Sequence, residues 1–173
     1  MASLLLAASA ATLVAGMQVG EPLPALEGEF LSGSRAALPQ AASGRVALLL
    51  LGFTYESRFA VEAWAGRFRR DFAGDRRVTF YEIPMIGGIA RLGKWFIGAG
   101  MRRGTPPEDH ENVITVYGGT EAWKRRVGFG DPGAAYLILI GRDGRVVLLA
   151  SGGFAEEPYQ ALRSEVSRLL EGQ

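Results

Sequence analysis

A continuous run of six apolar residues, Val46 to Leu51, is the feature that most constrains the fold of this chain. A strand that is apolar at every position has to be covered on both faces, which is typical of a central strand between layers of helices. After a short turn, apolar residues recur at three- and four-residue spacing and predict an amphipathic helix that ends at Gly74. These residues are Val61, Trp64, Phe68 and Phe72.

Turn signals and changes in periodicity divide the rest of the chain. Gly, Pro and Ser are frequent between Val19 and Gly44, which indicates a lead-in hairpin. The Gly-Arg-Asp-Gly sequence at 141–144 indicates a second, tight hairpin. The other predicted elements are strands at 78–83 and 113–117, helices at 87–104 and 120–126 (the latter with Thr120 as its N-cap), hairpin strands at 136–140 and 145–149, and a closing helix at 156–172.

This order of elements predicts an α/β fold with a mixed central sheet, flanking helices and an N-terminal hairpin extension. Right-handed crossovers leave few other ways to connect it. A length of 173 residues suits one domain, which we place at 17–173. The 19 basic and 18 acidic residues are nearly balanced, and this argues against a nucleic-acid-binding protein.

Residues 1–16 form an uncharged apolar segment that ends in Val14-Ala15-Gly16 and is similar to a signal or anchor sequence. We therefore expect an exported, periplasmic or membrane-associated protein. The segment lacks the basic start of a signal peptide, since no Lys or Arg precedes Arg35. The alternative is a cytoplasmic protein that starts at Met17.

The turn after the first core strand resembles the active-site turn of thioredoxin-like proteins, which carries Cys-X-X-Cys. Here Glu56-Ser57-Arg58-Phe59 takes that place, and the chain has no cysteine. On the peroxiredoxin pattern Thr-X-X-Cys, Ser57 takes the position of the reactive thiol. Thiol exchange and peroxide reduction both begin with a thiolate, so the sequence predicts neither activity.

The residues of this turn are our candidate binding site: Thr54, Tyr55, Glu56, Ser57 and Arg58. A simpler role for Thr54 and Ser57 is capping of the helix, and Glu56 complements the helix dipole. Two alternatives stay open. One is a cysteine-independent enzyme with Glu56 as general base, assisted by Ser57 and Thr54. The other is a degenerate peroxiredoxin-like or TlpA-like redox protein.

Other catalytic landmarks are missing from the sequence. The cis-proline of thioredoxin-like proteins falls at Ala135, although Pro132 is close enough to replace it. His110 lies in a polar loop without further ligands at metal-binding spacing. No dinucleotide or phosphate fingerprint occurs. We therefore expect neither a metal nor a cofactor.

The predicted helix that begins near Ile89 carries four basic and no acidic residues. Such a helix suits an anionic membrane or an acidic partner, and the alternative is an ordinary cover for the sheet. The residues that we assign to this partner- or membrane-facing surface are Arg91, Lys94, Trp95, Phe96, Arg102 and Arg103.

Between Arg45 and Leu170 the chain resembles the mitochondrial F-type ATP synthase assembly factors of the ATP-ten type, which are thioredoxin-like and lack the redox cysteines. The segments that carry this likeness are 53–59, Trp64, 78–83, 113–119, 124–126 and 138–146. The resemblance implies a non-catalytic, chaperone-type assembly factor whose partner is a protein client, such as a subunit of a membrane complex. A bacterial-type homologue could serve a different client.

Overall fold

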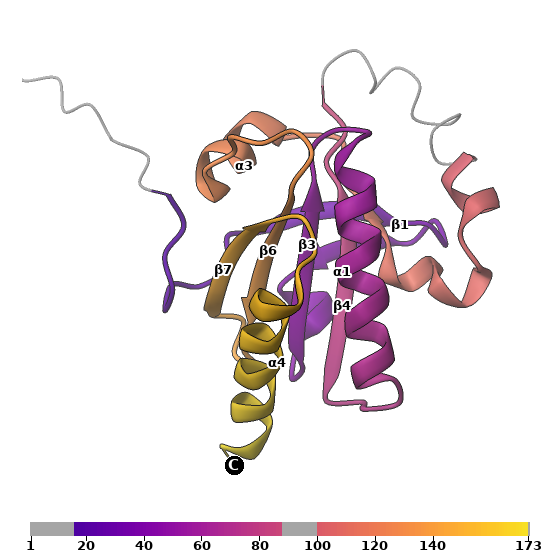
Figure 1. The fold of residues 1–173 in the computed structure, drawn as a ribbon. Coiled ribbons are helices and arrows are strands. Elements are labelled where there is room, and N and C mark those ends of the chain that lie inside the picture. Colours follow the sequence, from indigo (N-terminus) through magenta and orange to yellow (C-terminus); the bar gives the residue numbers. More distant parts are fainter. Residues whose placement is uncertain (1–15, 88–99, 173) are drawn as a thin grey trace, which may run out of the picture.

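The computed structural model describes residues 16–87 and 100–172. A mixed four-stranded sheet lies at its centre, in the order β4 (Val78–Pro84), β3 (Val46–Gly52), β6 (Ala135–Ile140) and β7 (Val146–Gly152) (Figure 1). β3 and β4 are parallel, whereas β6 runs antiparallel to both β3 and β7. The predicted central strand and the antiparallel final hairpin are confirmed.

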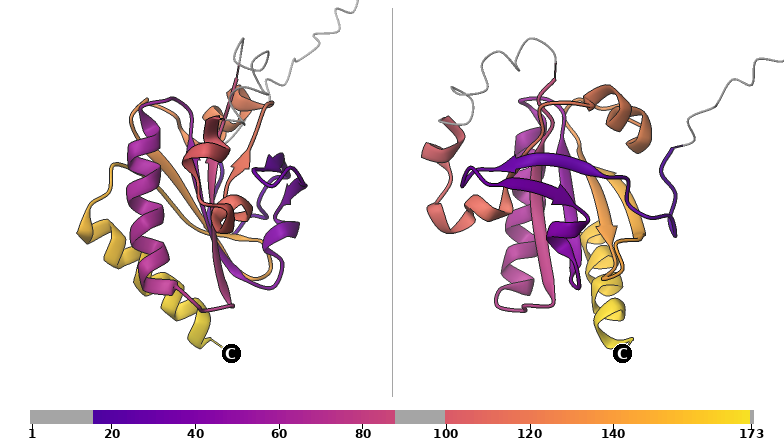
Figure 2. Two further views of the ribbon diagram at one scale, coloured as in Figure 1. Left: turned by 90° about the vertical axis from the view of Figure 1, so that its right-hand side faces the viewer. Right: turned by 180° about the vertical axis from the view of Figure 1, so that it is seen from behind.

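Two helices cover one face of this sheet. They are α1 (Ser57–Phe72) and α4 (Glu156–Glu171), and they lie together on one side in Figure 2. Val46, Leu48 and Leu50 of β3 point into this layer, where they share a core with Trp64 and Phe68 of α1. Alternate residues of a strand face opposite sides, so the other residues of β3 need a second cover.

A small antiparallel sheet provides most of that second cover, in the order β2 (Arg35–Leu38), β1 (Leu26–Phe30) and β5 (Ile114–Thr115). The expected N-terminal hairpin is therefore present, and Leu49 and Leu51 of β3 share a core with Leu26 and Leu38 of this sheet and with Trp123 of the helix at 120–127. Gly28 allows the close packing, because a Cβ atom there would lie 2.6 Å from Cγ2 of Ile114. Short 3₁₀ helices, Gln40–Ala42 and Pro107–Asn112, precede β3 and β5.

Two local predictions need correction. The strand predicted at 113–117 is shorter: β5 covers Ile114–Thr115 and pairs with β1. Isolated parallel bridges, Glu82 to Val113 and Met85 to Val116, connect this region to β4. Thr120 is the first residue of α3 (Thr120–Val127) and not its N-cap. Gly119, with φ of 69°, takes that place because the left-handed region favours glycine.

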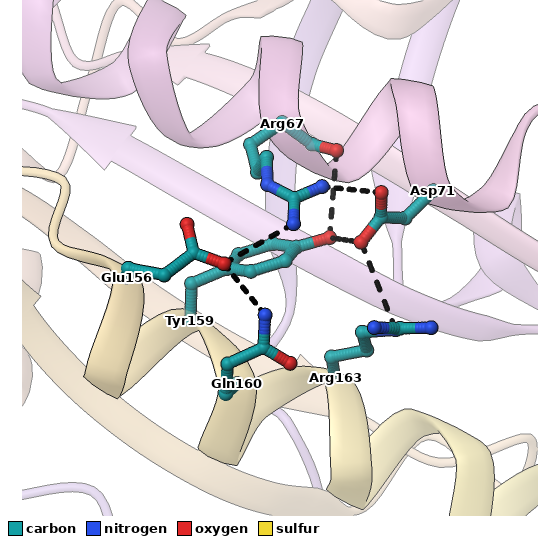
Figure 3. Close-up of polar contacts among 6 residues, drawn as sticks. All are labelled: Arg67, Asp71, Glu156, Tyr159, Gln160 and Arg163. Carbon is teal, nitrogen blue, oxygen red and sulfur yellow. Dashed lines mark hydrogen bonds and ion pairs between the residues drawn. The ribbon is translucent and has the colours of Figure 1, made fainter.

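A polar network joins α1 to α4 (Figure 3). The fully buried Tyr159 donates a hydrogen bond of 2.8 Å from its hydroxyl to Oδ2 of Asp71. Arg67 lies over the Tyr159 ring at 4.7 Å and pairs with both Asp71 and Glu156. Hydrogen bonds from Tyr159 and Arg67, together with the nearby guanidinium charges, hold the pKa of Asp71 below its usual value against the effect of burial. The network fixes the helix that begins at the candidate turn.

Candidate functional site

The candidate turn connects the end of β3 to the start of α1, as predicted. β3 ends at Gly52, and α1 begins at Ser57 and contains Trp64. In Figure 1 the turn lies at the end of the molecule away from the C-terminal end of α4. The structure thus brings Thr54, Tyr55, Glu56, Ser57 and Arg58 together at the first turn of a helix that packs on the sheet.

Thr54 and Ser57 bond to each other in both directions. The Ser57 amide donates to Oγ1 of Thr54 at 3.1 Å, and the Thr54 amide donates to Oγ of Ser57 at 3.3 Å. The Ser57 hydroxyl also donates to the Thr54 carbonyl at 2.8 Å. Oγ1 of Thr54 thus satisfies the first amide of α1, which gives the capping role predicted for Thr54 a direct structural basis. Ser57 is the first residue of the helix, and its hydroxyl bonds the backbone of the turn and not a helix amide.

Ser57 is completely buried and closely packed. A Cβ atom at Gly52 would lie 2.8 Å from Oγ of Ser57 and 3.3 Å from Cγ2 of Val61. Glycine is therefore needed at the end of β3 if a polar side chain is to occupy position 57. A hydroxyl that is enclosed and fully hydrogen-bonded in this way is not presented to a substrate.

The loop before β6 contacts the turn through Pro132. Its carbonyl oxygen accepts a hydrogen bond of 2.6 Å from Oγ1 of Thr54. Pro132 is therefore beside the turn, but it is in trans; the cis peptide bond among the described residues joins Leu38 to Pro39. Ala135, the position of the missing cis-proline, is the first residue of β6.

Three aromatic residues pack together next to the turn: Phe53, Phe129 and Tyr136. The ring of Phe53 lies edge-on to those of Phe129 and Tyr136, at centroid distances of 5.4 and 5.5 Å. The Tyr136 hydroxyl accepts hydrogen bonds from the amides of Gly130 and Asp131, at 2.9 and 3.0 Å. These contacts pack the loop against the residue that precedes the turn, Phe53.

Three side chains project from this frame. Tyr55 and Phe59 are 72% and 59% exposed, and Val19 is the other exposed large hydrophobic residue in the described part of the chain. Arg58 lies over both rings, with its guanidinium carbon 4.5 Å from the Tyr55 centroid and 4.6 Å from that of Phe59. We call Tyr55, Arg58 and Phe59 the aromatic clamp. Phe59 was missed as a contact residue, although the sequence placed it in the turn motif.

Glu56 is exposed at the N-cap position of α1, and its side chain makes no capping hydrogen bond. The hydroxyls that would assist it as a general base are directed elsewhere, because Thr54 and Ser57 bond to each other and to Pro132. The surface hollow of about 420 Å³ lies at the opposite end of α1 and is lined by Phe72, Arg76 and Phe80 among others. Glu56 therefore does not sit in an apolar cleft of the kind that catalytic carboxylates use.

A half-buried carboxylate that the sequence analysis did not single out, Glu82, lies on β4. Burial raises the pKa of Glu82 to about 7; the charge of Arg69 acts against this rise, and Glu62 and Asp109 add to it. Oε1 of Glu82 is 3.9 Å from Arg69, which binds Asp109 more closely, at 2.9 Å. The sequence signal was an acid within the apolar segment 78–83.

The other residues that the sequence analysis discussed, those of the basic surface and His110, do not belong to the turn. Arg91, Lys94, Trp95 and Phe96 lie outside the described residues, whereas Arg102 and Arg103 are exposed in a helical segment. His110 has its Nε2 atom 3.0 Å from the Thr105 carbonyl oxygen. Residues 16–87 and 100–172 contain no cluster of three potential metal ligands, and none of their helices is long and apolar enough to cross a bilayer.

Comparison with solved structures identifies the fold. The thioredoxin domain of a thiol-disulfide oxidoreductase from Bacteroides vulgatus superposes with a TM-score of 0.56 at 17% identity, covering 87% of this chain and 99% of that one. The chain has a thioredoxin-like fold. It combines this fold with an absence of cysteine, so the redox motif of its structural neighbours is missing.

Other neighbours have different activities on the same fold. A thiol peroxidase from Chromobacterium violaceum matches with a TM-score of 0.58 at 14% identity, covering 89% of this chain and 88% of that one. BsSco, a member of the Sco family of cytochrome c oxidase assembly proteins, matches with a TM-score of 0.57 at 14% identity, covering 88% and 96%. No family model and no curated protein sequence matches the chain.

Proposed function

We propose that this protein is a non-catalytic, chaperone-type assembly factor that binds a protein client through the turn Thr54–Phe59. The observation that carries this proposal is a division of roles within the turn. Ser57, at the position of the reactive thiol, is buried and bonded internally, whereas Tyr55 and Phe59 are exposed. A site that encloses its only aligned nucleophile and presents aromatic rings is suited to binding.

An assembly role is supported by two likenesses. BsSco belongs to the Sco family of cytochrome c oxidase assembly proteins, and its similar fold supports an assembly role. The sequence resemblance to the ATP-ten group points in the same direction. We therefore propose a client that is a subunit of a membrane complex, of which F-type ATP synthase is the leading candidate.

Peripheral membrane contact is a second part of the proposal. It rests on the basic residues Arg91, Lys94, Arg102 and Arg103 and on the apolar segment 1–16. Basic residues close to an anionic bilayer each contribute roughly 1 kcal/mol to binding. An exported or membrane-associated protein would meet such a client at the membrane surface.

Two experiments test the proposed function. Insulin-reduction and peroxide-consumption assays should give no turnover above buffer, because no thiolate can form; enzyme-dependent turnover would contradict the non-catalytic assignment. Pull-down from native membranes should recover a membrane-complex subunit with the wild-type chain, and recover much less with the Tyr55→Ser/Phe59→Ser variant. Equal recovery of that subunit by both proteins would contradict the proposal that the turn is the client-binding surface.

A further inference from the structure

The geometry of the aromatic clamp restricts what Arg58 can bind. Its guanidinium carbon lies over the Tyr55 ring at 4.5 Å and over the Phe59 ring at 4.6 Å. A guanidinium group donates hydrogen bonds within its own plane. Contact with both exposed rings positions the group at the start of α1, and none of its N–H groups donates a hydrogen bond to another described residue.

The charge of Arg58 is not neutralised within the described part of the chain. Two other arginines of α1 have carboxylate partners there: Arg67 pairs with Asp71, and Arg69 pairs with Asp109 at 2.9 Å. For Arg58 the contacts among the described residues are those with the two rings. The arginine is thus held by apolar surface at the exposed start of a helix, with its complementary anion still to be supplied.

We propose that the aromatic clamp binds a carboxylate, and that its occupant is an Asp or Glu residue flanked by apolar side chains in the protein client. This inference rests on the proposed function and names the chemistry that the turn recognises. A carboxylate can accept two parallel hydrogen bonds from one guanidinium edge. Tyr55 and Phe59 offer the neighbouring side chains of the client an apolar surface on either side of that contact.

Glu56 limits the affinity of the clamp for acidic segments. It is exposed, precedes the cationic residues of the helix, and carries the same charge as the proposed occupant. Like charges at the surface repel weakly because solvent and salt screen them. Replacing Glu56 with Gln should therefore strengthen binding of an acidic segment slightly, by about twofold.

A peptide titration followed by NMR tests the clamp. The probes are acetyl-Leu-Glu-Leu-amide and the matched acetyl-Leu-Gln-Leu-amide, added to the full-length ¹⁵N-labelled chain. The acidic peptide should shift the amide signals of residues 54–60 and bind about fivefold more tightly than the neutral one. Arg58→Gln should abolish this difference, and Arg58→Lys should retain only part of it because an ammonium group lacks the planar fork.

The control is Arg70→Gln, which removes an exposed arginine from the same helix and should leave the peptide affinity unchanged. Equal binding of the two peptides, or preference for the acidic peptide that survives Arg58→Gln, would overturn the inference. Failure of the clamp is distinguishable from failure of the proposed function. If wild type captures the membrane subunit and Tyr55→Ser/Phe59→Ser does not, the turn binds a client by other chemistry.

Discussion

The Ser57 hydroxyl donates a hydrogen bond of 2.8 Å to the carbonyl oxygen of Thr54, and the Thr54 amide returns one of 3.3 Å to that hydroxyl. In thioredoxin-like enzymes of the peroxiredoxin type, the aligned position carries the thiolate that attacks the substrate. Here the same position stabilises the backbone of the turn. The turn has the strand-turn-helix geometry of the fold, and the side chain at the thiol position stabilises its backbone.

This relationship predicts a coupling between Ser57 and Gly52. Ser57→Ala removes buried hydrogen bonds and should lower the free energy of unfolding by about 1–2 kcal/mol. Gly52→Ala places a methyl group 2.8 Å from Oγ of Ser57 and should cost about 1–3 kcal/mol. The double variant should be more stable than the sum predicts, because alanine at 57 relieves the clash. Chemical denaturation measures all four proteins, and strict additivity would contradict the close contact.

Glu82 predicts a pH dependence of stability. The folded state holds the Glu82 proton up to a pKa of about 7, whereas the unfolded chain releases it near the ordinary glutamate pKa of 4.5. The folded state therefore binds more protons in this window, and its stability falls as pH rises from about 4.5 to about 7. The loss on ionisation is of the order of 3 kcal/mol.

Glu82→Gln separates this effect from the other titrating groups. The variant should gain stability relative to wild type as pH rises, with most of the gain between the two pKa values. Denaturation at about pH 4 and about pH 8 measures the difference. The exposed Glu157→Gln is the matched control and should follow wild type. A wild-type minus Glu82→Gln difference that does not change with pH would show that the Glu82 pKa is not raised.

The basic residues of the partner- or membrane-facing surface predict membrane binding that weakens as the salt concentration rises. Replacing Arg91, Lys94, Arg102 and Arg103 together with Gln should reduce binding to anionic vesicles and leave the unfolding transition unchanged. Sedimentation with vesicles that contain phosphatidylserine measures the loss, and neutral phosphatidylcholine vesicles are the control. Unchanged binding of the quadruple variant at low salt would reduce this segment to a cover for the sheet.

The sequence predicted the parts of the fold that depend on local patterns. The apolar run of β3, the helical spacing from Val61 to Phe72 and the turn at 141–144 each gave an element at its predicted place. The pairing of β5 with β1 was not predictable in this way, because two residues carry no periodicity. Thr120 was misplaced because a serine or threonine before a helical pattern resembles a cap, whereas the left-handed φ of Gly119 is visible only in the structure.

The candidate site was predictable in position and only partly in role. The turn motif located Thr54 and Ser57, and the capping role of Thr54 follows from its residue type. The contact of Arg58 with both Tyr55 and Phe59 depends on side-chain directions that a linear sequence does not specify. The raised pKa of Glu82 arises mainly from burial in the folded structure, whereas the sequence shows only an acid within an apolar segment.

Photo-crosslinking from the turn tests the central claim most directly. Benzoylphenylalanine in place of Phe59 should form an adduct with a membrane-complex subunit in native membranes, and the adduct should survive reductant because no disulfide is involved. The same probe at Ser164, exposed on α4, is the control and should form none. Adduct from position 59 alone is the predicted result. No adduct from position 59, or equal adduct from both positions, would contradict the account of the turn as a client-binding surface.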